Sequence, residues 1–336
     1  MPLNLITDVP GLAVGHATDL TLGSGVTAIL FDSPATVSVC VLGGAPGGRD
    51  TGMLEPEMSV AGVDAVVLSG GSAFGLDAAG GAQAALREAG RGFKLGSALI
   101  PLASCAILFD LLNGGNKAWG RFSPYRDLGY AASVAAAPGA FALGTVGAGT
   151  GATTATVKGG LGSASGVTRA GHVVGAIVAV NAVGAPTIGD GPWFWAAPFE
   201  QGAEFGGRGW PAQMPAGALA PRLKGGPGTA TTIALVATDA ALTKPQAKRL
   251  AIMANDGLAR AILPAHAPMD GDTVFAASTG RRLLANDIDL TELGQAATIA
   301  LARAIARAVY EATALPYPGA LASWRDRFGV LGITKE

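Results

Sequence analysis

Short apolar stretches rich in β-branched residues recur along the chain, and turn-forming residues separate them. Such segments are typical of buried β-strands. An Asp-Ser-Pro turn is expected between the first two of them. The pattern predicts seven strands: Val26–Phe31, Thr36–Leu42, Asp64–Ser69, Ala103–Phe109, His172–Val183, Thr231–Thr238 and Thr273–Ser278.

Four longer segments place Ala and Leu at helical spacing instead. They predict helices over Leu76–Ala89, Leu128–Ala137, Lys244–Leu263 and Leu290–Ala312. The strands come in groups and do not alternate strictly with the helices. This order favours stacked antiparallel or mixed sheets between helical layers over a doubly wound parallel sheet.

Two segments depart from this pattern. Residues 184–228 are rich in Pro and Gly and hold three of the five Trp residues, which predicts a long surface segment with little regular structure. Loops of this length are unusual in compact domains and tend to be functional or processed. From Ala142 to Gly166 the small residues Gly, Thr, Ser and Ala dominate, and Lys158 is the single charge.

Composition narrows the class of protein. Of 336 residues 51 are Gly, 49% are hydrophobic and 14% are charged, with a net charge of -1. Such a chain is too apolar to be disordered, and its balanced charge predicts no nucleic-acid partner. Two cysteines form no disulfide framework, no signal peptide is evident, and no apolar run reaches the ~20 residues of a membrane span. We therefore expect a cytoplasmic protein with no membrane partner.

Several known functional motifs are only partly matched by the sequence. The turn Gly70–Gly75 (GGSAFG) lies between a strand and a helix, where some folds bind dinucleotides. The acid expected about 20 residues later is missing, so a tight structural turn is the better interpretation. Cys40 and Cys105 lie among apolar neighbours and are expected to be buried and inert. The three histidines lack the spacing of a zinc motif.

A hydroxyl residue stands where the long loop meets a strong strand, in the sequence Gly228-Thr229-Ala230-Thr231-Thr232. If the peptide bond before Thr231 breaks, the threonine becomes an N-terminus. Its α-amino group, with an ordinary pKa of about 8, can then act as the base for its own hydroxyl. That chemistry needs no histidine. The alternative is that Thr is simply a good strand former.

Two acids, Asp270 and Asp272, flank Gly271 just before a predicted strand. Acids around a glycine can form a plain Asx turn. They can also hold an ammonium group and a hydroxyl in place. The local sequence leaves both readings open, and it leaves the nearby His266 as a structural residue.

Several segments in the same order resemble one family, the L-aminopeptidase/D-esterase family of self-processing peptidases, which includes the 6-aminohexanoate-oligomer (nylon oligomer) hydrolase. The resemblance runs from about residue 5 to 325. It rests on ITDVPGLAVGH, VVLSGGSAFGL, AIVAVNAVG, TTIALVATDA, and DGLARAI followed by DGDTVFA.

The resemblance implies an α/β fold of one domain, a four-layer α-β-β-α sandwich of the N-terminal-nucleophile type. Members are made as one chain and cut themselves once. A cut between Ala230 and Thr231 would give a large subunit of residues 1–230 and a small one of 231–336. Thr231 would then be the nucleophile of a hydrolase that acts on peptide or linear amide bonds. Ester bonds are a further class of substrate that the resemblance implies.

The resemblance also implies the roles of four further residues. Asp270 and Asp272 match the polar pair that orients the nucleophile, Lys158 matches a lysine in the Gly-rich segment, and Asn181 matches the oxyanion-hole asparagine. Lys158 is expected to lower the pKa of the new amine by like-charge repulsion. A plain surface lysine and a satisfied core asparagine are the alternatives for Lys158 and Asn181.

Two positions depart from the related hydrolases. Ala230 stands where that branch has Asn before the cut, and Phe109 stands where a Tyr assists at the oxyanion. A lost oxyanion donor costs about 10²–10³ in rate. Two alternatives therefore stay open: an acyltransferase like the ornithine acetyltransferases, which cut between Ala and Thr, and an uncleaved non-catalytic relative.

The partners implied by the family are a small peptide or amide substrate and further copies of the chain. Members form homo-oligomers, often tetramers of the cleaved pair. No cofactor and no metal are implied.

Overall fold

One long strand organises the sheet in the computed structural model, which describes residues 2–225 and 230–329. The strand is β2 (Ser24–Val41). Its first half pairs antiparallel with β1 (Leu12–Asp19) and β4 (Val63–Ser69). Its second half pairs antiparallel with β11 (Thr273–Leu283). Because β2 changes partners along its length, the sheet divides into two layers.

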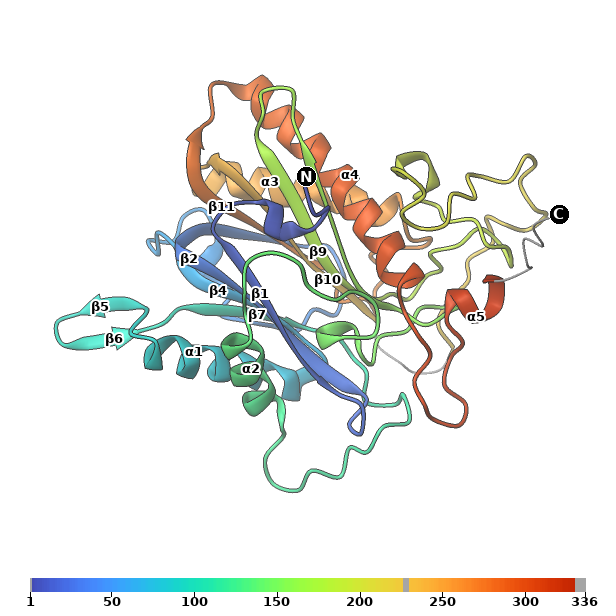
Figure 1. Ribbon diagram of the computed structural model, residues 1–336, viewed down its shortest axis with the longest axis horizontal. Helices are drawn as coiled ribbons and strands as arrows, with labels where there is room; N and C mark the ends of the chain where they lie inside the picture. The colour runs from blue at the N-terminus through green and yellow to red at the C-terminus, as the bar shows by residue number, and fades with distance from the viewer. Residues whose placement is uncertain (1, 226–229, 330–336) are drawn as a thin grey trace.

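Each layer continues away from β2. The first adds β7 (Ala103–Ile107), parallel to β4, and then the short β3 (Gly48–Arg49). The second adds β10, parallel to β11, and then β9 and β8 in antiparallel order. A separate hairpin of β5 and β6 projects from one end of the molecule (Figure 1). The bounds of the last five strands are β10 (Thr231–Ala241), β9 (Val173–Asn181), β8 (Gly160–Val167), β5 (Phe93–Leu95) and β6 (Ala98–Ile100).

Helices cover the outer face of each sheet layer. In Figure 1, α1 and α2 lie in the lower half of the molecule, and α3 and α4 lie in its upper half. A fifth, short helix, α5, lies beside the end of α4. The bounds are α1 (Ala78–Glu88), α2 (Tyr125–Val134), α3 (Lys244–Ala259), α4 (Asp287–Tyr310) and α5 (Trp324–Phe328).

Three apolar clusters fill the spaces between these layers. The central cluster joins side chains from both sheet layers, among them Phe31, Leu68 and Leu235. A second cluster lies between α3, α4 and the layer of β8 to β11, and a third lies between α1, α2 and the layer of β1, β4 and β7. The order helix, sheet, sheet, helix confirms the predicted four-layer α-β-β-α sandwich.

The excess of glycine has a packing cause. A Cβ on Gly162 of β8 would lie 2.0 Å from the Ala304 carbonyl oxygen of α4. A Cβ on Gly129 of α2 would lie 2.1 Å from the Ala78 carbonyl oxygen of α1. Both distances are far inside van der Waals contact, so only glycine lets these backbones approach so closely.

Several elements of the structure differ from those predicted. The turn expected at residues 32–34 is wrong, because β2 runs through it as one strand, with a register shift between Leu30 and Ala35. That exposed stretch is where β2 passes from one layer to the other, and Pro34 is tolerated at such an irregularity. The pattern missed β1 and β8, the short strands β3, β5 and β6, and the short helix α5. Gly160, Gly162 and Gly166 give β8 too little β-branched character for a sequence pattern to detect.

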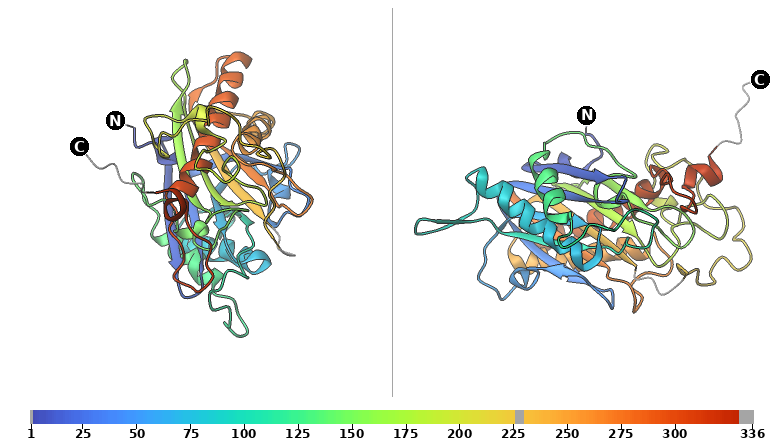
Figure 2. Two further views of the ribbon diagram at one scale, coloured as in Figure 1. Left: turned by 90° about the vertical axis from the view of Figure 1, so that its right-hand side faces the viewer. Right: turned by 90° about the horizontal axis from the view of Figure 1, so that it is seen from below.

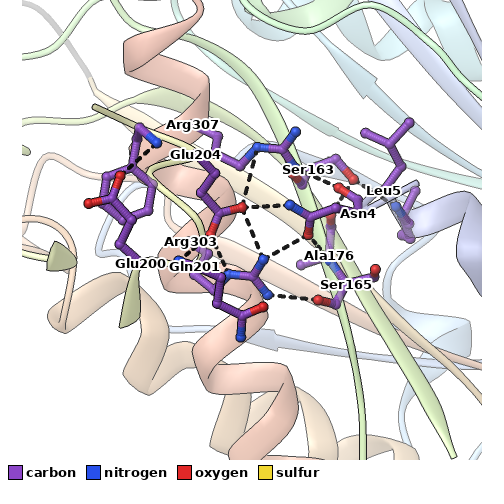
Figure 3. Close-up of polar contacts among 12 residues, drawn as sticks. Asn4, Leu5, Ser163, Ser165, Ala176, Glu200, Gln201, Glu204, Arg303 and Arg307 are labelled. Atoms are coloured by element: carbon purple, nitrogen blue, oxygen red, sulfur yellow. Dashed lines mark hydrogen bonds and ion pairs between the residues drawn. The ribbon is translucent and has the colours of Figure 1, made fainter. Parts of the chain in front are cut away.

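The segment from 184 to 228 has little regular structure, as predicted: in its described part the only helix is the 3₁₀ turn Ala197–Phe199. It forms the loops at one end of the molecule (Figure 2). It is not purely a surface segment, however, because Phe194 and Phe205 are buried in the core beside α4. Glu204 from the same segment forms a buried ion pair with Arg303 of α4 (Figure 3).

Within the described ranges, no helix is both long and apolar enough to span a membrane.

Candidate active site

Three chain segments meet where β10 begins. Thr231, the first residue of β10, lies opposite Asn181, the last residue of β9. Ala230 makes a parallel bridge with Asp270, in the loop that leads into β11. The sheet topology thus gathers residues 181, 230–231 and 270–272 in one place. Gly228 and Thr229 of the predicted junction lie outside the described residues.

The carbonyl group of Ala230 is held by two donors. The Thr231 hydroxyl donates to the Ala230 carbonyl oxygen at 2.5 Å, and the Gly271 N–H donates to it at 2.9 Å. A Cβ on Gly271 would lie 2.7 Å from Thr231 Oγ1, so a side chain there would crowd the hydroxyl. Thr231 is buried, with 3% of its surface exposed. In the peptide bond that the sequence predicts to be cleaved, the carbonyl oxygen is therefore bound by a backbone N–H and by the hydroxyl of the next residue.

Asp272 joins the start of β10 to His266. Its Oδ1 accepts the Thr232 N–H at 2.8 Å. Its Oδ2 accepts the His266 N–H at 3.0 Å and lies 2.9 Å from His266 Nδ1. His266 itself has a positive φ of 58°, which is strained for a residue with a side chain. The sequence favoured a structural role for His266, and the structure brings this histidine into direct contact with one of the two acids.

Asp270 is buried beside Asp272, and one of its carboxylate oxygens, Oδ1, has no hydrogen-bond partner among the described residues. Burial raises the pKa of Asp270 to about 7, the negative charge of Asp272 adds to the rise, and backbone hydrogen bonds and Lys224 oppose it. A carboxyl group with a pKa near neutrality can exchange a proton with a reacting group at neutral pH.

Asn181 is held on both sides of its amide. Its Nδ2 donates to the Phe109 carbonyl oxygen at 3.0 Å. Its Oδ1 accepts the Thr153 N–H at 3.0 Å and the Lys224 Nζ at 2.8 Å. The side chain that the family resemblance assigns to the oxyanion is thus next to the junction, with one of its N–H groups occupied by backbone.

Lys158 is completely buried rather than a surface lysine, with 1% exposed. Its Nζ donates to the carbonyl oxygens of Gly149 and Gly159 at 3.0 and 2.8 Å. Burial lowers its pKa to about 7; Asp110 opposes this shift and Lys224 reinforces it. Among the contacts found in the described residues, none joins Lys158 to Thr231.

Lys158 and Lys224 line the same cavity of about 510 Å³, which is bounded by Phe109. Burial also lowers the pKa of Lys224 to about 7, although Asp270 and Asp110 oppose the shift. With pKa values of about 7, both amines are only partly protonated at neutral pH. Lys224 was not among the predicted site residues because it lies in the irregular segment. Its only signal in the sequence is a lysine seven positions before Thr231.

A second cavity of about 340 Å³ is lined by Thr231 and shares Phe109 with the first. The turn Gly70–Gly75 forms one of its walls through Ser72 and Ala73. Gly71 and Ser72 have φ values of 86° and 53°, so the sequence is a tight turn, as predicted, and it also shapes this cavity.

Among the described residues, neither the cysteines nor the possible metal ligands form a reactive group. Cys40 and Cys105 are buried and free, as predicted. In the parts of the chain that the structure describes, no three His, Cys, Asp or Glu side chains gather into a group able to hold a metal ion.

Comparison with known proteins decides the family. The model of peptidase family S58 matches residues 4–320. The chain belongs to peptidase family S58. It is therefore a hydrolase of peptide or amide bonds, which confirms the family and the enzyme class expected from the sequence.

Curated relatives of this S58 chain have names of two kinds. A protein of Mycobacterium tuberculosis, named an uncharacterized aminopeptidase, is 42% identical over 97% of this chain and 98% of its own length. The 6-aminohexanoate-oligomer endohydrolase of Kocuria sp. is 30% identical over 81% of this chain and 74% of its own.

Solved structures confirm the fold of this S58 chain. A β-aminopeptidase of Burkholderia sp. superimposes with a TM-score of 0.70 at 25% identity, covering 97% of this chain and 92% of that one. The L-aminopeptidase D-Ala-esterase/amidase of Ochrobactrum anthropi, described as a variant of the Ntn hydrolase fold, superimposes with a TM-score of 0.72 at 23% identity and the same coverage.

Proposed function

We propose that this S58 chain cuts itself between Ala230 and Thr231, and that Thr231 then serves as the N-terminal nucleophile of an amide hydrolase. The observation that carries the proposal is the double contact on the Ala230 carbonyl oxygen, from the Thr231 hydroxyl at 2.5 Å and the Gly271 N–H at 2.9 Å. The products are a large subunit of residues 1–230 and a small subunit of 231–336.

Self-cleavage begins with attack by the Thr231 hydroxyl oxygen on the Ala230 carbonyl carbon. The Oγ–C bond forms, the C–N bond breaks, and the amine nitrogen takes up the proton that the hydroxyl loses. Asp270 carries that proton between the two atoms, since burial places its pKa at about 7. The Gly271 N–H stabilises the negative charge on the carbonyl oxygen. Water then hydrolyses the ester, which leaves a carboxylate on Ala230 and a free α-amine on Thr231.

In the mature enzyme the α-amino group of Thr231 takes the hydroxyl proton as the oxygen attacks a substrate amide. Asp272 fixes the start of β10 through the Thr232 N–H. The charges of Lys158 and Lys224 favour the neutral form of the new amine, which is the form that acts as a base.

Asn181 supplies a side-chain N–H to the substrate oxyanion. Its Nδ2 carries two N–H groups, and the Phe109 carbonyl occupies one of them. This leaves one donor for the reaction. Phe109 has no hydroxyl to add a second donor, so Asn181 carries more of this task than it would beside a tyrosine.

The substrate class that fits this chemistry is a small peptide or linear amide, in line with the names of the relatives. We extend the proposal to assembly as a homo-oligomer of cleaved pairs, as the family resemblance implies.

Intact mass after expression tests the proposal. The wild-type chain is expected as two fragments, and N-terminal sequencing of the smaller should begin at Thr231. Thr231→Val, which keeps the shape and removes the hydroxyl, should stay at 33.2 kDa. Thr291→Val is the matched control, because Thr291 is exposed on α4.

Two outcomes contradict the proposal. A wild-type chain that stays at full length would favour the uncleaved, non-catalytic alternative. Cleavage of Thr231→Val at the same rate as wild type would exclude Thr231 as the attacking residue.

A further inference from the structure

The cavity at Thr231, called here the acyl pocket, has an unusual lining for an enzyme with aminopeptidases among its relatives. Its residues come from the loop 45–48, the turn at Ser72, Ala73 and Leu76, and the end of β7 with Ile107 and Phe109. Apart from Thr231, the only polar side chain among them is Ser72. Among the described residues that line it, none is Asp or Glu.

The carboxylates around the pocket lie outside its lining. Asp110 accepts the Ser24 hydroxyl at 2.6 Å and the Gly71 N–H at 2.8 Å, so both of its oxygens are bound. Arg49 donates to the Leu76 carbonyl oxygen at 3.3 Å, and its guanidinium is paired with the Asp50 carboxylate at 3.5 Å. Asp270 and Asp272 lie near the start of β10 but are not among the residues that line the pocket. A substrate ammonium group held by this lining would have no lining carboxylate to pair with.

Gly47 in the lining and Gly71 beside it are closely packed by neighbouring side chains. A Cβ on Gly47 would lie 2.3 Å from Ile107 Cδ1, so this wall has no spare room. A Cβ on Gly71 would meet the ring of Tyr125 at 2.1 Å, which locks the turn against α2. An arriving substrate therefore meets a preformed apolar surface.

We propose that the acyl pocket selects a small, uncharged, apolar acyl group, so that the preferred substrates are amides of neutral acyl groups rather than of free α-amino acids. An unpaired ammonium group in an apolar site is strongly disfavoured, whereas an alkyl group gains from burial. The proposal rests on the proposed function, since it assigns the pocket to the acyl part of what Thr231 attacks. Ala73, which is exposed at the rim, is the position at which charge preference is set.

A matched pair of substrates tests the preference at pH 7, where an α-amino group is protonated. Butanoyl 4-nitroanilide and L-2-aminobutanoyl 4-nitroanilide differ only by that amino group. For the wild type we expect kcat/KM to be at least about tenfold higher for the butanoyl compound. Ala73→Asp should reverse or abolish this ratio by adding a carboxylate, and Ala73→Asn, its neutral counterpart of similar size, should keep it.

Binding separates this proposal from the proposed function. The Thr231→Val chain cannot cleave itself or react, yet it retains the pocket in the form described above. Calorimetry with butanamide and L-2-aminobutanamide should show tighter binding of butanamide to this chain. Equal or tighter binding of the amino compound, or no binding of either, overturns the acyl pocket even if self-cleavage proceeds. Conversely, failure of self-cleavage with butanamide selectivity intact would leave the pocket standing and remove the nucleophile.

Discussion

Two buried polar clusters in this S58 chain can be compared directly. One joins Arg303 of α4, Glu204 of the long loop and Asn4 near the N-terminus (Figure 3). The other surrounds Thr231 with Asp270, Asp272, Asn181 and the two lysines. Both are removed from solvent, but their polar atoms are satisfied in different ways.

In the Arg303 cluster Arg303 and Glu204 are closely paired, while the Nε of the neighbouring Arg307 has no hydrogen-bond partner among the described residues. Arg303 donates from Nε and Nη2 to the two carboxylate oxygens of Glu204 at 2.6 and 3.0 Å. Its Nη1 donates to the Ser165 carbonyl oxygen at 2.7 Å. A bidentate guanidinium–carboxylate pair of this kind has a fixed geometry. The cluster ties three distant segments of the chain together.

Around Thr231 the charges are not neutralised in pairs. Asp270 keeps a carboxylate oxygen without a partner in the described residues, and its pKa rises to about 7. The pKa values of Lys158 and Lys224 fall to about 7. Burial alone therefore does not distinguish a structural cluster from a reactive one. A pKa shifted to near neutrality does, because it leaves protons free to move near neutral pH.

Breaking the paired cluster should have the largest effect on stability. Arg303→Met leaves the Glu204 carboxylate buried without its main partner, and we expect a loss of about 3–5 kcal/mol in the free energy of unfolding. Chemical denaturation measures this loss. The self-cleavage rate of the folded fraction should not change, since Arg303 contacts no residue of the junction.

The matched control for Arg303→Met is Arg281→Met. Arg281 pairs with Asp32, but both side chains are about half exposed, 43% and 54%. An exposed pair contributes only about 0–1 kcal/mol. Equal losses in the two variants would show that the buried pair has no special structural weight.

Removing the Asn181 amide should separate the two reactions at the junction. Asn181→Ala is expected to lower kcat on butanoyl 4-nitroanilide by about 10²–10³, the usual cost of one oxyanion donor. Self-cleavage should persist, because the Gly271 N–H binds the Ala230 carbonyl oxygen. Steady-state kinetics and intact mass measure the two effects, with exposed Asn116→Ala as control. A chain that loses self-cleavage but keeps turnover once cut would assign Asn181 the opposite role.

The smallest predicted effect is on the pH dependence of self-cleavage. Because the pKa of Asp270 is raised to about 7, its carboxylate form is lost as the pH falls below 7. The rate should then drop about tenfold per pH unit. Time courses of intact mass between pH 5 and pH 8 would show this.

The charges of Asp272 and Lys224 also shift the pKa of Asp270. Two variants therefore test whether the pH profile of self-cleavage belongs to Asp270. Asp270→Asn should be slow and independent of pH over this range. Lys224→Met should shift the midpoint upward, because it removes a positive charge that favours the carboxylate. An unchanged profile in Asp270→Asn would exclude Asp270 as the proton carrier.

Much of the fold could be predicted from the sequence because burial leaves a recognisable pattern of apolar residues. β4, β9 and β10 are continuous apolar runs, and α3 and α4 keep helical spacing, so they were predicted within a few residues. β8 escaped because glycine replaces the side chains that would carry the pattern. The continuity of β2 escaped because Asp32, Ser33 and Pro34 have the local chemistry of a turn, whereas pairing with two different strands holds them extended.

For the candidate site, the chemistry of Thr231, Asp270 and Asp272 was accessible from residue types and family resemblance. Lys224 and His266 were not, because nothing local marks an irregular loop residue that folds back onto Asn181 or a histidine that meets an acid six positions away.

The sequence by itself determined the layers and the family, and it singled out Thr231 as the candidate nucleophile, since these depend on local periodicity, residue type and motif order. Only the tertiary structure decided which groups share a buried space: the Gly271 N–H on the Ala230 carbonyl, the two lysines behind Phe109, and an acyl pocket without a carboxylate. Such contacts join residues far apart in the chain. Their burial and pairing, which set charge and specificity, exist only once the sheets have packed.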